Sequence, residues 1–149
     1  MARTTFSGPV ASDNGFIGNV TGNIAGSGTI THDTTAAINA TATATAAQVA
    51  TGYITSTSAA ATTITLPTGT ALGAALGATQ GTVFDLYIDN TAGSNAVTIA
   101  VNTNAVLSTA AVDTAGSFGD LTVASGATGL ARYTLMFSSA TAYAFTRTA

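Results

Sequence analysis

The stretch from Thr34 to Phe84 holds no charged side chain, and much of it alternates between Thr and small apolar residues. Residues 38–45 are the clearest case, with Ile or Ala at every second position and Asn or Thr between them. Because successive side chains of a β-strand point to opposite faces, this period of two predicts a half-buried strand. A membrane span would need about 20 predominantly apolar residues, and polar residues or glycines interrupt this stretch too often for that. The pattern therefore favours short strands of a sheet.

Other short runs along the chain have the same strand character. They cover residues 49–56, 62–66, 82–89, 97–101, 121–123, 130–138 and 143–147. The runs 82–89 and 97–101 are the strongest, and the segment between them is polar and contains a glycine, so we predict that these two form a hairpin. Many short strands separated by turn signals are typical of an antiparallel sandwich.

One segment, residues 68–77, has a different rhythm. Leu72 and Leu76 lie four residues apart, as on one face of a helix, and Thr70 is a candidate N-cap. The glycines in this segment weaken the helix, so we expect about two turns laid across one end of a sheet. The predicted fold class is all-β, an antiparallel β-sandwich or jelly roll with this one short helix and an extended N-terminal arm.

The arm is predicted from residues 1–34, which are rich in Gly and Asn and contain the repeat GNVT-GNIA at residues 18–25. A repeat of four residues supplies one apolar side chain per unit, too little to fold alone. The segment is either an arm that becomes ordered against a partner or a disordered terminus. We predict a binding arm over 1–34 and a β-sandwich body over 35–149.

The residue inventory leaves few means for catalysis or metal binding. The chain has no Cys, Lys or Glu, and its one histidine is His32, at the junction of arm and body. A serine nucleophile needs a base beside it, and structural zinc needs several Cys or His ligands. We therefore predict that the chain is not an enzyme and has no catalytic residues, no cofactor and no metal site. Three Arg and a net charge of −3 also argue against nucleic acid as a partner.

Two sets of polar side chains leave alternatives open. Asp85 and Asp89 share one face of their strand, about 13–14 Å apart at roughly 3.4 Å per residue, which is too far for a shared metal or a glycosidase pair. They face solvent or lie at a subunit seam. The tyrosines line a carbohydrate-binding surface or sit at strand edges and interfaces; they are Tyr53, Tyr87, Tyr133 and Tyr143.

The scarcity of charge points to assembly. Charged residues make up 6% of the chain, against about 25% in ordinary soluble domains. Large apolar side chains are also few, and ordering the backbone costs about 1–2 kcal/mol per residue. Burial between copies would supply the area that a thin monomer core lacks. The composition therefore favours a structural protein that assembles with itself.

Four segments resemble a known class of virion protein. The stretches TATATAAQVATGYITSTSAAATTITLPTGTALGAAL at 41–76, VFDLYIDNTAGSNAVTIAV at 83–101, YTLMFSSATAYAFTR at 133–147 and GNVTGN at 18–23 are similar to the capsid decoration, or cement, proteins of tailed bacteriophages. The resemblance covers most of the chain in style and segment order, and it includes no catalytic-type motif.

This resemblance implies a jelly-roll homotrimer on the outer surface of the phage head, where it would bridge neighbouring major capsid subunits. The expected partners are further copies of the chain and the major capsid protein, with neither nucleic acid nor membrane. The arm would contact the shell, and the candidate contact residues are Arg3, Phe6, Phe16, Ile17, Val20 and Ile24.

Two rival functions stay open at this stage. In the first, the chain is a head-fibre or tail-fibre module that recognises a surface glycan through tyrosine-lined loops. In the second, it is a bacterial surface or pilus subunit, which would need a secretory signal or a donor strand, and neither is evident in the sequence.

Overall fold

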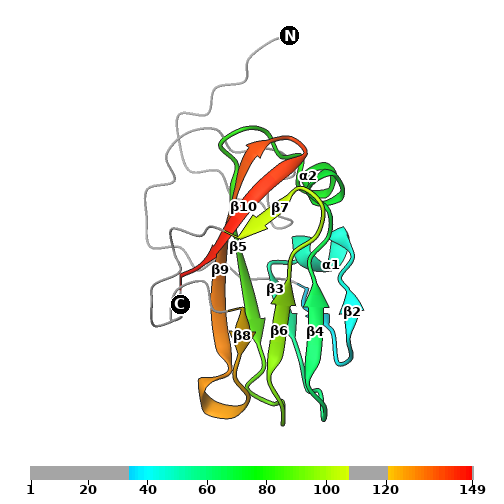
Figure 1. Ribbon diagram of the computed structural model, residues 1–149, viewed down its shortest axis with the longest axis vertical. Helices are drawn as coiled ribbons and strands as arrows, with labels where there is room; N and C mark the ends of the chain where they lie inside the picture. The colour runs from blue at the N-terminus through cyan, green and yellow to red at the C-terminus, as the bar shows by residue number, and fades with distance from the viewer. Residues whose placement is uncertain (1–33, 108–120, 149) are drawn as a thin grey trace, which may run out of the picture. The chain divides into compact units, whose positions relative to one another are not determined.

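Two β-sheets and two short α-helices make up the part of the chain that the computed structural model describes, residues 34–107 and 121–148 (Figure 1). Sheet A has the strand order β1-β3-β5-β9-β10-β7. Its strands are β1 (Ala36–Ala37), β3 (Tyr53–Thr55), β5 (Val83–Asp89), β9 (Leu130–Ser139), β10 (Ala142–Arg147) and β7 (Ala105–Leu107). Sheet B has the order β2-β4-β6-β8. Its strands are β2 (Ala42–Thr43), β4 (Thr62–Thr65), β6 (Val97–Ala100) and β8 (Thr122–Val123).

The chain winds between the sheets in three successive coils, β1–β2, β3–β4 and β5–β6. A short loop leads from sheet A to sheet B in each coil, and helices α1 (Ala46–Ala50) and α2 (Gly69–Leu76) carry the first two returns. Equivalent strands of neighbouring coils therefore pair in parallel, so that Ile54 pairs with Ile88 and Ile64 with Ile99.

The predicted antiparallel sandwich or jelly roll is wrong. Five of the eight strand pairs formed by the described residues are parallel, and the structure is mixed α/β. The sequence pattern located most strands, but their pairing follows the coils. Parallel neighbours need a crossover connection, which here is a strand of the other sheet together with a loop or helix.

The predicted hairpin of 82–89 and 97–101 is also wrong. Its two halves are β5 in sheet A and β6 in sheet B, which do not pair with each other. The chain crosses between the sheets at Asn90, which is fully buried. Its side-chain Nδ2 donates to the carbonyl oxygens of Asn95 and Ala124, both at 2.9 Å, and so holds the crossing loop. The segment between the two runs is therefore the loop, or corner, in which the chain passes from sheet A to sheet B.

Residues 38–50 depart from the predicted strand pattern, whereas β3 lies within the predicted run 49–56. The chain turns after the buried Ile38, and β2 covers only two residues of the alternating run. Helix α1 then begins after Thr45, whose hydroxyl accepts from the Gln48 N–H while the Gln48 side chain accepts from the Thr45 N–H. This capping box is a sequence signature of a helix start.

The predicted helix in 68–77 is confirmed as α2, with one correction. The N-cap is Thr68, whose hydroxyl accepts from the Ala71 N–H at 3.2 Å, and not Thr70. The helix ends at Gly77, which has φ of 59°, a left-handed conformation that favours glycine. Of the two leucines on the predicted face, Leu72 is fully buried and Leu76 packs against the core.

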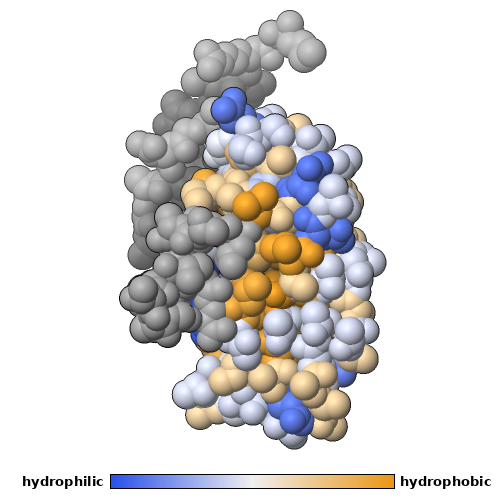
Figure 2. Space-filling model, in the orientation of Figure 1, coloured by the Kyte–Doolittle hydropathy of each residue, from blue (hydrophilic) through white to orange (hydrophobic). Residues whose placement is uncertain are grey.

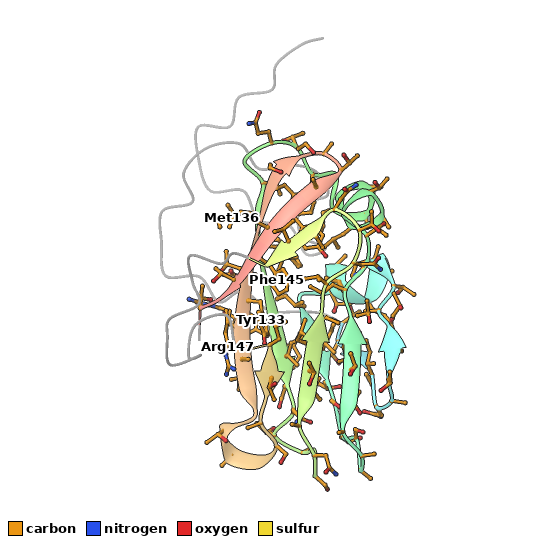
Figure 3. The ribbon with its side chains drawn as sticks, in the orientation of Figure 1. Tyr133, Met136, Phe145 and Arg147 are labelled. Atoms are coloured by element: carbon orange, nitrogen blue, oxygen red, sulfur yellow. The ribbon has the colours of Figure 1, made fainter. Side chains whose placement is uncertain are left out.

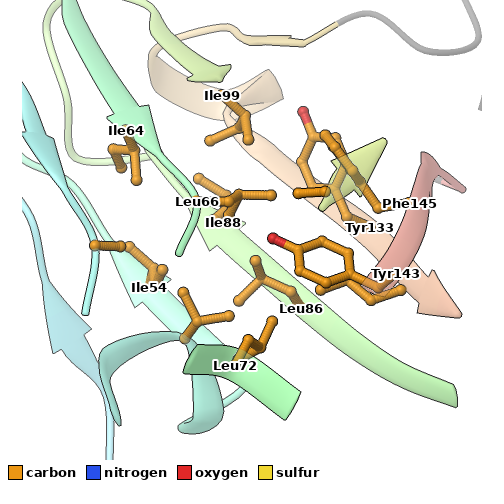
Figure 4. Packing of buried hydrophobic residues seen from close by; sticks show 14 of the residues in the cluster. Ile54, Ile64, Leu66, Leu72, Leu86, Ile88, Ile99, Tyr133, Tyr143 and Phe145 are labelled. Carbon is orange, nitrogen blue, oxygen red and sulfur yellow. The ribbon is translucent and has the colours of Figure 1, made fainter. Parts of the chain in front are cut away.

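The core lies between the sheets, and both sheets contribute to it (Figure 4). Sheet A supplies Tyr133 and Phe145, whose ring centroids are 6.0 Å apart, and sheet B supplies Ile64 and Ile99. The Tyr143 hydroxyl donates to the Pro67 carbonyl oxygen at 2.9 Å, and burial raises the pKa of this phenol. The strands β9 and β10, which hold these aromatic residues, form the antiparallel hairpin that ends the described chain.

Side chains of the charge-free stretch join one coil to the next. The Asn39 side-chain oxygen accepts from the Thr57 N–H at 2.9 Å, and the Thr41 hydroxyl accepts from the Thr63 N–H at 3.1 Å. Each bond links a loop of one coil to the following coil. Thr and Asn in this stretch therefore hold the coils in register.

Candidate functional site

Charge in the described chain is confined to three adjacent strands of sheet A. The charged side chains of residues 34–107 and 121–148 are Asp85 and Asp89 on β5, Arg132 on β9 and Arg147 on β10. Asp85, Asp89 and Arg132 lie on the face of sheet A that points away from sheet B, because their strand neighbours Leu86, Ile88, Ala131 and Tyr133 are buried. We call this the outer face.

Two of the four tyrosines meet on the outer face. Tyr53 and Tyr87 pair in register on β3 and β5, with ring centroids 6.3 Å apart and planes inclined by 23°. The Tyr53 hydroxyl donates to Asp89 Oδ2 at 2.7 Å. The next strand places Arg132 beside Tyr87. Tyr133 and Tyr143, in contrast, belong to the core, so the structure does not bring all four tyrosines to one surface.

The two carboxylates on β5 are held by neutral donors. Asp89 Oδ1 accepts from both the hydroxyl and the N–H of Thr91, at 2.6 and 2.9 Å. These bonds, together with that from Tyr53, lower the pKa of Asp89, and the same Tyr53–Asp89 bond raises the pKa of Tyr53. Asp85 accepts from the Thr134 hydroxyl at 2.6 Å. The two aspartates share a face as predicted, but each has its own partners.

Arg147 lies at the end of β10 and forms a hydrogen bond with the other sheet. Its Nη1 donates to the Thr122 carbonyl oxygen at 2.9 Å, on strand β8 of the other sheet. Figure 3 shows Arg147 at the lower end of β10. This bond links edge strand β8 to sheet A, so Arg147 ties the two sheets together.

A row of apolar side chains runs across the strands of the outer face, at strand positions other than those of the charged residues. Register pairs Val83 with Met136, Met136 with Ala144, and Ala144 with Val106, so the row runs over β5, β9, β10 and β7. We call these four residues the apolar row. Val83 is 62% exposed, Met136 44% and Val106 61%. Figure 3 shows Met136 on the side of sheet A away from Tyr133 and Phe145.

The side of the molecule that Figure 2 presents also exposes apolar surface. Figure 2 shows apolar residues gathered over β7 and the neighbouring end of β6. Val106 lies in β7, and Val101, which is 45% exposed, follows β6. The exposed apolar surface therefore reaches the edge of sheet A at β7.

Sequence reasoning did not find the apolar row. Met136 alternates with the buried Leu135 and Phe137 along β9, but no local signal joins it to Val83 or Val106. An apolar residue at an outward position of a strand was the available signal. Whether such a residue joins others in a continuous row depends on the register of four strands.

Several predicted features cannot be placed. Arg3, Phe6, Phe16, Ile17, Val20, Ile24 and His32 lie outside the described residues. Within the described ranges, no group of three or more His, Cys, Asp or Glu side chains could hold a metal ion. Neither α-helix in these ranges has the length and apolar character needed to cross a bilayer.

Comparisons with protein-family models, with curated proteins and with solved structures find no match to this chain.

Proposed function

We propose that this chain is a structural virion protein that binds the outer surface of a phage capsid as a homotrimer and joins neighbouring major capsid subunits. The proposal draws on the four segments that resemble phage decoration proteins, and on the scarcity of charged and catalytic side chains. It no longer includes a jelly roll, because the sheets are mainly parallel.

The observation that carries the proposal is a charge-poor body with an exposed apolar row. Monomeric proteins rarely leave large contiguous apolar patches in water, and such patches mark interaction sites. The described residues hold four charged side chains, and three of them share the outer face with this row. A surface of this kind suits permanent contact with other protein subunits.

The proposed mechanism is mass action. A ligand that binds only the assembled shell stabilises it, and many copies bound to one shell add their effects. The body would form the trimer, and the arm at 1–34 would lie against the capsid and link neighbouring subunits. No chemical step is involved.

Deleting residues 2–30 is expected to abolish coating of the capsid while the trimer persists. The deletion removes the candidate contacts Phe6, Phe16, Ile17, Val20 and Ile24 and leaves the core of the sandwich intact. Purified heads would be mixed with the full-length or shortened protein, and bound protein would be counted by particle mass and electron cryo-microscopy. A full-length variant with Phe16 and Ile17 replaced by Ser is the matched control, because it removes two candidate contacts without shortening the chain. Normal coating by the shortened protein would contradict the assignment of the arm.

A second candidate function is glycan recognition by a fibre module, and the Tyr53–Tyr87 pair favours it. Neighbouring aromatic rings can stack on a sugar, and carboxylates beside them can accept hydrogen bonds from its hydroxyls. Tyr87→Ala should then lower binding to a glycan array at least about tenfold, which is the loss of roughly 1.4 kcal/mol. Tyr53→Phe is the control that keeps both rings and removes the bond to Asp89. An array without hits for the full-length protein would remove this candidate.

A further inference from the structure

We infer that the apolar row, Val83, Met136, Ala144 and Val106, is the contact through which copies of this chain associate. The inference deepens the proposed assembly and rests on it only in taking the chain to be an oligomer. It assigns the contact to the outer face of sheet A.

The geometry of the row suits a packing surface. Its four members come from four adjacent strands in one register line. Neighbouring strands lie about 4.7–4.9 Å apart, so the row extends roughly 14 Å from Val83 to Val106. Met136 is central, and its flexible thioether side chain can adapt to an opposing surface. The row is therefore continuous, unlike apolar residues scattered singly over a surface.

Polar residues border the row on both sides. On one flank, two residues along the strands from Val83 and Met136, Asp85 accepts a hydrogen bond from the Thr134 hydroxyl. Thr134 in turn pairs in register with Thr146. On the other flank, the exposed Ser138 follows Met136 on the same face of β9. An apolar centre with a polar rim is the usual arrangement of a protein–protein interface.

The charges of the outer face favour a second copy as the occupant. Two carboxylates, Asp85 and Asp89, share this face with the guanidinium of Arg132. A face that carries both signs can complement itself, since Arg132 of one copy can approach a carboxylate of another while the apolar rows pack. A partner surface with charge of a single sign would be repelled by one group or the other. Two rows that pack against each other form a two-fold contact, and in a trimer the three rows would meet by lining the three-fold axis.

Met136→Asp is the direct test. A buried, unpaired carboxylate at the centre of the contact should weaken association at least about a hundredfold. At micromolar concentration the mass measured by sedimentation equilibrium should fall from that of the oligomer to that of one chain. Thr98→Asp is the matched control, because Thr98 is exposed in mid-strand on the outward side of sheet B, and it should leave the mass unchanged. A monomeric wild-type chain, or a Met136→Asp variant that keeps the oligomer mass, overturns the inference.

Cysteine cross-linking gives a second test that does not depend on how Met136→Asp folds. The chain has no cysteine, so one introduced thiol is the only one present. Met136→Cys and Val106→Cys should form covalent dimers with a short bis-maleimide, and Thr98→Cys should remain monomeric on a denaturing gel. Cross-linking of Thr98→Cys without cross-linking at either row position also overturns the inference.

The inference and the proposed function can fail separately. If Met136→Asp dissociates the oligomer but the wild-type protein does not coat heads, the contact stands and the capsid function fails. If the variant coats heads as an intact trimer, the capsid function stands and the contact is wrong. A wild-type dimer that Met136→Asp dissociates supports the contact and contradicts the proposed trimer.

Discussion

Asn90→Asp is expected to destabilise the folded protein by about 3–5 kcal/mol at pH 7, a large part of the total stability of a typical domain. Asn90 is fully buried, and its Nδ2 donates to the carbonyl oxygens of Asn95 and Ala124. An ionised Asp has no proton to donate, so its oxygen would face those carbonyls. The variant would carry a buried negative charge at the corner where the chain passes from β5 to β6.

The expected dependence on pH has a definite sign. Burial beside carbonyl oxygens would raise the folded-state pKa of the introduced Asp above its unfolded value of about 3.9. The folded state then binds the proton more tightly, so stability is greatest below the unfolded pKa and is lost as pH rises through the folded pKa. Urea unfolding at pH 4 and pH 7 should show the variant closer to wild type at pH 4.

Asn39→Asp is the matched control for this experiment. Asn39 is exposed, and its side-chain oxygen accepts from the Thr57 N–H, a bond that a carboxylate can also accept. Its unfolding free energy should stay within about 0.5 kcal/mol of wild type. A loss below about 1 kcal/mol in Asn90→Asp at pH 7 would show that the corner does not depend on the amide.

Gly73→Ala is expected to destabilise the protein by at least about 2 kcal/mol, although Ala is the better helix former by roughly 1 kcal/mol. A Cβ at Gly73 would lie 1.9 Å from the Ala140 carbonyl oxygen, in the turn between β9 and β10. A Cβ at Gly69 would likewise lie 2.3 Å from the Thr141 carbonyl oxygen. Helix α2 therefore lies directly on this turn, and its glycines permit the close approach.

Thermal and urea unfolding of Gly73→Ala would measure the loss, with Ala74→Gly as the control. Ala74 is exposed on the same helix, so its replacement should cost only the helix propensity, about 1 kcal/mol. Greater stability in Gly73→Ala than in wild type would mean that the helix can move away from the turn without loss.

The positions of most strands followed from local pattern, and their partners did not. The runs 62–66, 82–89, 97–101 and 130–138 all contain strands, and the side chains of β5 and β9 alternate between the core and the outer face with the period of two that marks a strand. The sequence nevertheless pointed to a hairpin where the chain changes sheets. Local alternation contains no information about which distant strand supplies the next row of hydrogen bonds.

For the helices, too, some features were predictable from local sequence and others were not. Leu72 and Leu76 marked α2, and the Thr45–Gln48 capping box was a readable signal for α1 that the surrounding alternation concealed. For the candidate site, the shared face of Asp85 and Asp89 was predictable from their spacing. The Tyr53–Tyr87 pair was not, because its members come from different coils and meet only through parallel register.

By itself, the sequence determined where most of the longer strands and the longer helix lie, because side-chain period is a local property. Tertiary structure decided that the strands stack as parallel coils, and this gives the scarcity of charge a second physical reason. In parallel coils, equivalent residues lie directly above one another about 4.7–4.9 Å apart, where like charges repel and Ile, Thr and Tyr pair well. The apolar row also exists only in the fold, since four strands distant in sequence must align before Val83 and Val106 end one continuous line.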